Sequence, residues 1–270
     1  MISYREFVQG FRELGLDRNK PVIAHASLSA FGEIRGGAET LLGALLQSVS
    51  GLMMPAFTYK TLLIPEAGPP DNGIAYGTGR DLNRMAEFFS LDMPADPMMG
   101  VLPETLRTRA SSKRSNHPIL SFTAAGLDSA LAVQTIDDPY APIRMLAEMD
   151  GWVLLLGVDH TVNTSIHYAE FLAGRKQFVR WALTSQGVKE CPHFPGCSDG
   201  FNSAAPYLAV ITRQVRIGSA DVLALPLSGL IERITILLQD DPLDMLCSRP
   251  DCERCNAVRQ VSQLVSYNPR

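Results

Sequence analysis

Several features that would point to a compartment or a class of partner are missing from this sequence. No apolar stretch approaches the roughly 20 residues of a membrane span, and residues 1–6 lack the basic and then apolar pattern of a signal peptide. We therefore expect a cytoplasmic protein. Positive charge is not in excess, because 24 Lys and Arg against 28 Asp and Glu give a formal net charge of −4. An acidic surface attracts neither nucleic acid nor an anionic membrane, so we expect neither as a partner, whereas a cationic small molecule is compatible.

Cysteine is scarce, and its five residues are an odd number for a disulfide framework. In a reducing compartment they are expected to be thiols or metal ligands. Cys247, Cys252 and Cys255 cluster near the C-terminus, and a Cys/His segment occurs earlier, at residues 191–197. Tetrahedral zinc takes four such ligands, and a Cys-x-x-Cys pair supplies two of them. The pattern predicts either a structural zinc that fastens a C-terminal tail (about residues 240–270) to the domain, with a fourth ligand from the earlier segment, or a set of free thiols.

Nucleotide-binding motifs are absent as well. Neither a Walker sequence nor a dinucleotide-binding fingerprint is present, which disfavours ATP and NAD. What is present is 46% hydrophobic and 19% charged residues, which suits a compact domain with a sizeable core. Strand-like and helix-like segments alternate throughout with no convincing linker, which favours a layered α/β fold with a parallel or mixed sheet.

Hydrophobic spacing predicts where the regular elements lie. Phe7, Phe11 and Leu14 share one face of an opening helix that ends before Asp17. Residues 58–79 are rich in proline and glycine and are predicted to form an ordered loop or lid. Further helices are predicted at 38–49, 82–89, 101–109, 143–149 and 229–238, and strands at 21–25, 51–55, 152–156, 177–183 and 214–225.

A histidine and a glutamate follow one of these strands closely. Residues 152–156 are continuously apolar, as expected for a central strand covered on both faces. Asn163 or Thr164 is a good N-cap, so a helix is predicted to begin there, and on that helix His167 and Glu170 share a face. The positive end of the helix dipole favours the neutral histidine that a general base needs. Ligands bind beyond the carboxyl ends of strands in α/β sheets, so the pair is a candidate catalytic site, with a core histidine beside a solvated glutamate as the alternative.

Five segments together resemble the aminoglycoside 3-N-acetyltransferase family. They occur in the family's order between about residues 20 and 215, and they are residues 24–32 followed by Gly36 and Gly37, 54–58, 96–104, 114–121 and 163–170. The resemblance implies a single-domain α/β/α sandwich over residues 1–270, with a central mixed, largely parallel sheet. It also implies acetyl-CoA as the co-substrate, the 3-amino group of a 2-deoxystreptamine ring as the acceptor, and resistance to aminoglycoside antibiotics as the role.

The loop that resembles the family's first segment is a candidate for holding the donor. Small residues between a strand and a helix offer backbone N–H groups, and the helix N-terminus adds positive potential. These residues are Ser27, Leu28, Ser29, Gly36 and Gly37, which we expect to contact the pyrophosphate or pantetheine of CoA. An ordinary strand-to-helix turn is the alternative.

A basic, hydroxyl-rich patch is a second candidate for the donor. Ser112, Arg114 and Ser115 are expected to contact phosphate or ribose groups, with a solvated loop as the alternative. His117 precedes a proline in the same patch and therefore has an extended backbone. We expect His117 to be structural or a donor contact rather than the base.

Recognition of an acceptor with several ammonium groups needs negative charge. Asp71 in the predicted loop or lid, together with Asp96 and Asp159 in or beside the matched segments, are candidates for substrate contacts. A solvated surface carboxylate is the alternative for each. Glu104 is expected instead to support its loop by capping or by pairing with Arg107.

The predicted mechanism is direct transfer. His167 takes a proton from the acceptor nitrogen, Glu170 orients or supports the imidazole, and groups near Thr164 and Ser165 stabilise the oxyanion. No cysteine precedes Cys191 in the matched core, which argues against a covalent intermediate on a thiol. Two other functions stay open, namely acetyl transfer to a different amine metabolite and non-catalytic binding of a cationic ligand. We expect a monomer or a homodimer.

Overall fold

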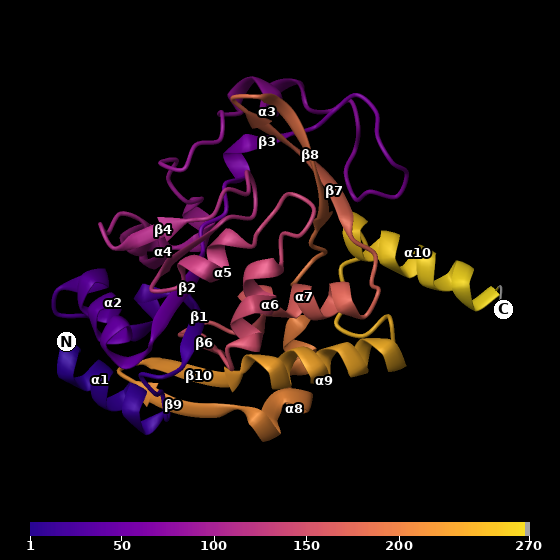
Figure 1. The fold of residues 1–270 in the computed structure, drawn as a ribbon. Helices are drawn as coiled ribbons and strands as arrows, with labels where there is room; N and C mark the ends of the chain where they lie inside the picture. Colours follow the sequence, from indigo (N-terminus) through magenta and orange to yellow (C-terminus); the bar gives the residue numbers. More distant parts are fainter. Residues whose placement is uncertain (268–270) are drawn as a thin grey trace.

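A seven-stranded mixed sheet forms the centre of the protein, which a computed structural model describes for residues 1–267 (Figure 1). In spatial order the strands are β4 (Ser112–Arg114), β5 (Phe122–Ala125), β2 (Gly51–Pro55), β1 (Pro21–Ala26), β6 (Trp152–Leu156), β10 (Ala220–Pro226) and β9 (Arg213–Ile217). The three central strands β2, β1 and β6 are parallel, and the outer strands pair antiparallel. Parallel pairing is therefore concentrated at the centre, where the predicted strand 152–156 lies between two neighbours.

Helices cover both faces of this sheet. On one face lie α1 (Tyr4–Glu13), α2 (Gly37–Ser48) and α4 (Val101–Arg107), and on the other lie α5 (Asp128–Ala132), α6 (Ala141–Glu148), α7 (Thr164–Leu172) and α9 (Leu227–Asp240). Leu154 and Leu156 of β6 pack into the first core, whereas Val153 and Leu155 pack into the second. Successive side chains of a strand point to opposite faces, so a strand covered on both sides is apolar throughout. The predicted single-domain α/β/α sandwich is confirmed.

The strand character predicted over residues 214–225 is confirmed, but the segment forms two strands, the hairpin of β9 and β10, rather than one. Gly218 makes the turn with a φ of 59°. A Cβ there would lie 2.2 Å from Ile2 Cδ1 and 2.8 Å from the carbonyl oxygen of Phe31. A left-handed turn against packed neighbours requires glycine, and the chain reverses at this point.

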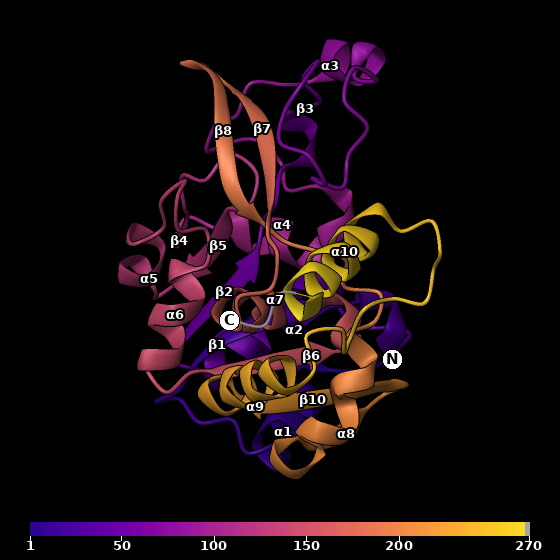
Figure 2. The same ribbon diagram turned by 90° about the vertical axis from the view of Figure 1, so that its right-hand side faces the viewer.

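A smaller antiparallel sheet stands at one end of the main sheet (Figure 2). It consists of β3 (Leu62–Leu63), β7 (Phe178–Thr184) and β8 (Gly187–Phe194), and α3 (Arg80–Met85) lies near its far end. Asn72 pins the predicted loop or lid to β7, donating to the carbonyl oxygen of Val179 at 3.0 Å and accepting from its N–H at 2.8 Å. The helix predicted over residues 82–89 ends early, because the chain becomes extended after Met85 and Phe89 pairs with β7.

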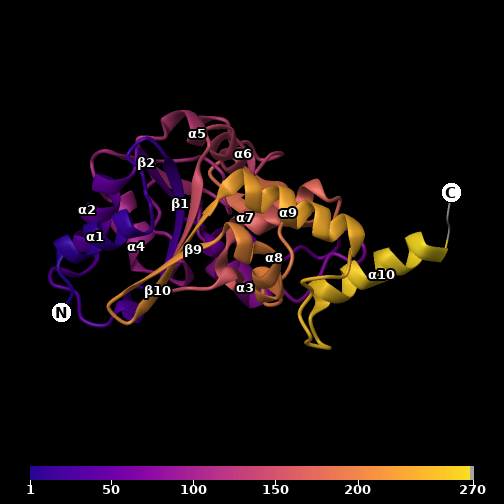
Figure 3. The same cartoon turned by 90° about the horizontal axis from the view of Figure 1, so that it is seen from below.

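The last helix, α10 (Glu253–Tyr267), extends away from the rest of the molecule (Figure 3). The short α8 (Ala205–Leu208) lies between β8 and β9. The tail predicted over about residues 240–270 is described as far as Tyr267, and its last three positions fall outside the described residues. Within residues 1–267, no helix combines the length and apolar character that a membrane span requires.

Candidate active site

A cleft of about 860 Å³ opens where the parallel strands of the main sheet end. Ser27 after β1, Phe57 after β2 and Val158 after β6 all line it. This edge of an α/β sheet gathers loop residues from several strands and is the usual place for a ligand. The volume suits a ligand of drug or cofactor size. Thr164 and His167 of α7 line the same cleft.

The predicted pair His167 and Glu170 meets on α7. His167 Nδ1 lies 2.6 Å from Glu170 Oε2, and both side chains are buried. Glu170 Oε1 accepts a hydrogen bond from Arg175 Nη1 at 2.8 Å, and Arg175 Nη2 donates to the carbonyl oxygen of Pro242 at 2.8 Å. A carboxylate beside Nδ1 favours the tautomer with the proton on that atom, which leaves the lone pair of Nε2 free to accept a proton. The geometry therefore fits a general base held in orientation by a buried carboxylate.

Helix α7 begins where the sequence predicts. Asn163 is its N-cap, and Asn163 Oδ1 accepts a hydrogen bond from the backbone N–H of Ser165 at 3.2 Å. Ser165 is fully buried and does not line the cleft, whereas Thr164 does. Of the two residues expected near an oxyanion, only Thr164 is in position to contact a ligand.

The small-residue loop after β1 forms another part of the wall. Ser27, Leu28, Ser29 and Gly37 line the cleft, and Gly36 stands just outside the lining as the N-cap of α2, with a φ of 82°. Backbone N–H groups at the start of this 12-residue helix carry positive potential without a charged side chain. The structure thus brings four of these five predicted donor contacts to the cleft wall.

The basic patch does not reach the cleft. Ser112, Arg114 and Ser115 are absent from its lining, and Ser112 Oγ is buried without a hydrogen-bond partner among the described residues. Arg114 donates to Ser121 Oγ at 2.9 Å and to two backbone carbonyl oxygens, and burial lowers the pKa of Arg114 to about 10. Ser115 Oγ accepts from the N–H of Phe122 at 2.8 Å. Arg114 and Ser115 thus have structural partners, and none of the three predicted donor contacts lines the cleft.

Two neighbouring expectations concern loop support. Glu104 pairs with Arg107 through two contacts of 2.7 and 2.8 Å, as expected. His117 is buried, and its Nδ1 accepts from the N–H groups of Ile119 and Leu120 at 3.1 and 2.9 Å. Burial lowers the pKa of His117 to about 4. These contacts give His117 a structural role.

The three predicted acceptor carboxylates do not line the cleft either. Asp159 accepts hydrogen bonds from the N–H of Thr161 at 3.0 Å and from Asn202 Nδ2 at 2.8 Å. Although partial burial opposes it, these hydrogen bonds hold the pKa of Asp159 below its usual range. Asp96 caps its own short turn, and Asp71 is exposed in the loop with a φ of 52°. Asp96 and Asp159 therefore cap short turns, and Asp71 is exposed and does not line the cleft.

Two further residues of the cleft, His25 and Tyr59, were not among the predicted site residues. His25 of β1 lines it, and His25 Nε2 is buried without a hydrogen-bond partner among the described residues. Burial and, secondarily, the neighbouring His167 lower the pKa of His25 to about 3, so it is neutral near pH 7. Tyr59 also lines the cleft, and burial, with Asp96 nearby, raises the pKa of Tyr59 to about 12. His25 could have been predicted as a site residue, because it is a polar residue at the carboxyl end of an apolar strand.

Charged side chains in the wall come from the C-terminal third of the chain. Among the lining residues of the described chain, Asp199 carries the one carboxylate and Arg254 the one guanidinium. Asp199 forms an exposed ion pair with Arg249 at 3.1 Å, and Arg254 donates to the carbonyl oxygen of Gly196 at 2.9 Å. The sequence did not predict Asp199 and Arg254 as site residues, because they lie outside the segments that suggested a ligand. The one feature that could have pointed to them is their position beside cysteines in the sequence.

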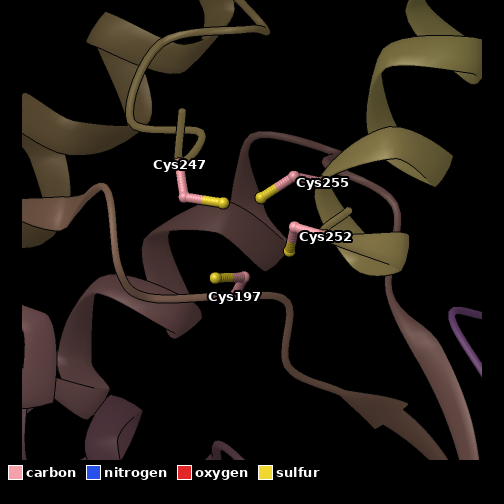
Figure 4. Close-up of side chains that lie close together, drawn as sticks. All are labelled: Cys197, Cys247, Cys252 and Cys255. Atoms are coloured by element: carbon pink, nitrogen blue, oxygen red, sulfur yellow. The ribbon is translucent and has the colours of Figure 1, made fainter. Parts of the chain in front are cut away.

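Four of the five cysteines converge beside this wall (Figure 4). Cys197 follows β8, Cys247 follows α9, and Cys252 and Cys255 stand at the start of α10. Their sulfur atoms all lie within 4.8 Å of one another, and all four residues are buried. The three C-terminal cysteines come together as predicted, and the fourth is Cys197, whereas Cys191 remains in β8.

A histidine beside a buried carboxylate, in a cleft at the ends of parallel strands, is an arrangement typical of acid–base enzymes. The model of the aminoglycoside 3-N-acetyltransferase family matches residues 23–239. The chain belongs to this family.

Curated relatives carry the same description. Aminoglycoside N(3)-acetyltransferase VII of Streptomyces paromomycinus is 37% identical over 180 residues, which are 62% of this chain and 60% of that protein. Aminoglycoside N(3)-acetyltransferase IX of Micromonospora chalcea is 34% identical over 182 residues, which are 63% of this chain and 62% of that protein. The matched part of the chain thus spans about 60% of the length of these relatives.

Solved structures share the fold. The apoenzyme of aminoglycoside acetyltransferase AAC(3)-IVa superposes with a TM-score of 0.77 at 24% identity, covering 96% of this chain and 97% of that chain. The YokD protein from Bacillus subtilis superposes with a TM-score of 0.78 at 21% identity, covering 89% and 94%. AAC-IIIb in a binary complex with CoASH has a TM-score of 0.72 at 24% identity, covering 88% and 96%.

Proposed function

We propose that this protein transfers the acetyl group of acetyl-CoA to the 3-amino group of the 2-deoxystreptamine ring of an aminoglycoside antibiotic. The observation that carries the proposal is the buried contact of 2.6 Å between His167 Nδ1 and Glu170 Oε2. His167, the histidine of this pair, lines the cleft. Membership of the aminoglycoside 3-N-acetyltransferase family gives the donor and the acceptor.

In this reaction a bond forms between the acceptor nitrogen and the thioester carbonyl carbon, and the carbon–sulfur bond breaks. His167 Nε2 takes the proton that the nitrogen loses and passes it to the departing thiolate, so CoA leaves as a thiol and the histidine returns to its neutral form. Glu170 balances the charge of the imidazolium between these two transfers, and Arg175 holds Glu170 in place. Thr164, at the open end of α7, supports the negative charge that develops on the carbonyl oxygen.

The donor fits the loop after β1. Backbone N–H groups around Ser27, Leu28, Ser29 and Gly37 suit the amides and pyrophosphate of CoA, since they offer donors without a bulky side chain. Arg254 adds a positive charge to the same cleft. AAC-IIIb, which shares the fold, has been solved in a binary complex with CoASH, and this supports CoA as a ligand of the protein.

The acceptor needs a carboxylate that is free to meet an ammonium group. Asp199 takes this role in our proposal, because it lines the cleft and its ion pair with Arg249 is exposed and therefore weak. AAC(3)-IVa, which shares the fold, has been crystallised with a gentamicin and with apramycin, and this supports a cationic aminoglycoside as the ligand.

No resident cofactor takes part in the proposed transfer, because acetyl-CoA is a co-substrate. The four clustered cysteines take no part in the transfer, since a zinc ion with four sulfur ligands is structural and has no open position for a substrate. We further propose that the protein works in the cytoplasm, where acetyl-CoA is at hand, as a monomer or a homodimer and without a nucleic-acid partner.

The test is the release of free thiol from acetyl-CoA, measured with and without a panel of aminoglycosides. We expect release that depends on the aminoglycoside, with the acetyl group located on the 3-nitrogen by NMR of the product. An aminoglycoside with that nitrogen already acylated is the matched control and gives no release. Release with other amines alone would identify a different acceptor, and tight binding without release would identify a binding protein; either result overturns the proposal.

A further inference from the structure

Four buried sulfur atoms lie together outside the reaction described above. They belong to the four-cysteine cluster, defined as Cys197, Cys247, Cys252 and Cys255. We propose that the four-cysteine cluster binds one zinc ion and that this ion fixes the part of the cleft wall that carries Asp199 and Arg254. The metal site stands independently of the acetyl transfer, and its effect on substrate binding rests on the proposed function.

The spacing of the sulfur atoms fits a single ion. In a tetrahedral site with Zn–S bonds of about 2.3 Å, the sulfurs lie about 3.8 Å apart, and here all four lie within 4.8 Å of one another. A cluster of several irons holds its cysteine sulfurs farther apart. Figure 4 shows the four side chains, which come from three separate segments, gathered around one common space.

Backbone N–H groups point at two sulfur atoms of the cluster. The backbone N–H of Asp199 donates to the sulfur of Cys197, and the N–H of Cys255 donates to the sulfur of Cys252. Donors of this kind stabilise a negatively charged sulfur, which is the form that binds metal.

Positive charge surrounds the cluster as well. Four thiolates and one Zn²⁺ carry a net charge of −2, which burial makes unfavourable unless it is compensated. The Arg249 side chain hydrogen-bonds the sulfurs of Cys247 and Cys252, and Arg259 donates to the carbonyl oxygen of Cys247 at 2.5 Å. Because Arg249 also pairs with Asp199 at 3.1 Å, these two guanidinium groups offset part of the charge of an occupied site.

The cluster also sits inside the cleft wall. Cys197 lies between Gly196 and Ser198, both of which line the cleft. Arg254, which lines it too, stands between the second and third C-terminal cysteines and donates to the carbonyl oxygen of Gly196 at 2.9 Å. One ion bound by both segments therefore holds together two parts of the wall that are far apart in the sequence.

Elemental analysis of protein purified without a chelator tests the metal site. We expect one equivalent of zinc per chain in the natural protein and in Cys191→Ser, a matched control because Cys191 is buried but lies outside the cluster. Cys252→Ser/Cys255→Ser should lose the zinc. If that variant fails to fold, the natural protein decides alone: less than about a tenth of an equivalent of zinc, or iron in its place, overturns the proposal.

The role in the wall has its own readout. We expect Cys197→Ala to raise the KM for the aminoglycoside about 10-fold with kcat little changed, and Cys191→Ala to leave both unchanged. An unchanged KM in a zinc-depleted Cys197→Ala protein overturns the role in the wall. If the protein binds zinc but transfers no acetyl group, the proposed function is wrong and the metal site stands. If the protein is active but binds no zinc, the metal site is wrong and the proposed function stands.

Discussion

At the scale of single residues, the proposed catalysis depends on what orients one imidazole ring. Glu170 contacts His167 Nδ1 and is itself almost completely buried. A buried carboxylate with fixed partners sets the tautomer of the histidine and balances the imidazolium. The charge of Glu170, rather than its shape alone, should therefore matter for turnover.

Replacement of this carboxylate by an amide is the first prediction. We expect Glu170→Gln to lower kcat about 10- to 100-fold, because the amide keeps the size but offers the imidazolium no charge. The measurement is steady-state thiol release over a range of pH. Glu232→Gln, at an exposed glutamate of α9, is the control and should behave as the natural protein. If Glu170→Gln and Glu232→Gln have the same turnover, the charge of Glu170 has no role in the reaction.

At the scale of elements, buried polar contacts connect α7 to the chain after α9. Arg175 pairs with Glu170 at 2.8 Å and donates to the carbonyl oxygens of Pro242 and Asp244. Its side chain and that of Glu170 are only 4% and 2% exposed, so solvent does not weaken the pair. Loss of one partner leaves the other charge buried and unpaired.

We therefore expect Arg175→Met to lower the free energy of unfolding by about 3–5 kcal/mol, measured by urea denaturation. Arg175→Lys keeps the charge and should lose less stability, because only the carbonyl contacts are weakened. A methionine variant as stable as the natural protein would show that the pair does not hold α7.

The turn after β6 provides a third prediction. Gly157 has a φ of 68°, and a Cβ there would lie 2.5 Å from Ala30 Cβ, next to the donor loop. Gly157→Ala should therefore destabilise the protein and raise the KM for acetyl-CoA. Gly174 has a similar φ of 76°, yet a Cβ there would meet no described atom within 4 Å. We expect Gly174→Ala to lose only about 1 kcal/mol, through backbone strain, with the KM for acetyl-CoA unchanged.

Elements with strong local signals were predictable from the sequence. The apolar run of β6, the cap at Asn163 and the helical spacing of His167 and Glu170 are all local, so the strand, the helix and the contact between these two side chains could be predicted. Gly218 was read as an ordinary strand residue, which hid the β9–β10 hairpin, because the packing that demands glycine there involves the N-terminus. Asp199 reaches the cleft through contacts between distant segments, which no local pattern encodes.

At the scale of the whole molecule, two buried histidines make stability depend on pH. Burial and, for His25, the nearby His167 lower the pKa from 6.5 to about 3 in His25 and to about 4 in His117. Below about pH 6.5 these histidines bind protons in the unfolded chain but stay neutral in the folded chain. Their contribution to stability is therefore complete above about pH 6.5 and is lost progressively as the pH falls toward 4.

We expect the free energy of unfolding to fall by up to about 1.4 kcal/mol per pH unit for each of these histidines. Urea denaturation at about pH 7, about pH 5.5 and about pH 4.5 measures this dependence. His25→Gln removes one of the two groups and should flatten the dependence. A free energy of unfolding that stays constant over this range would show that the histidines are not held neutral.

The most direct measurement is the aminoglycoside-dependent release of thiol from acetyl-CoA by His167→Gln, compared with the natural protein. We expect turnover to fall about 100- to 10,000-fold, while far-UV circular dichroism and the midpoint of thermal unfolding stay close to those of the natural protein. Turnover within about threefold of the natural protein in a folded variant would contradict a role for this imidazole as the base.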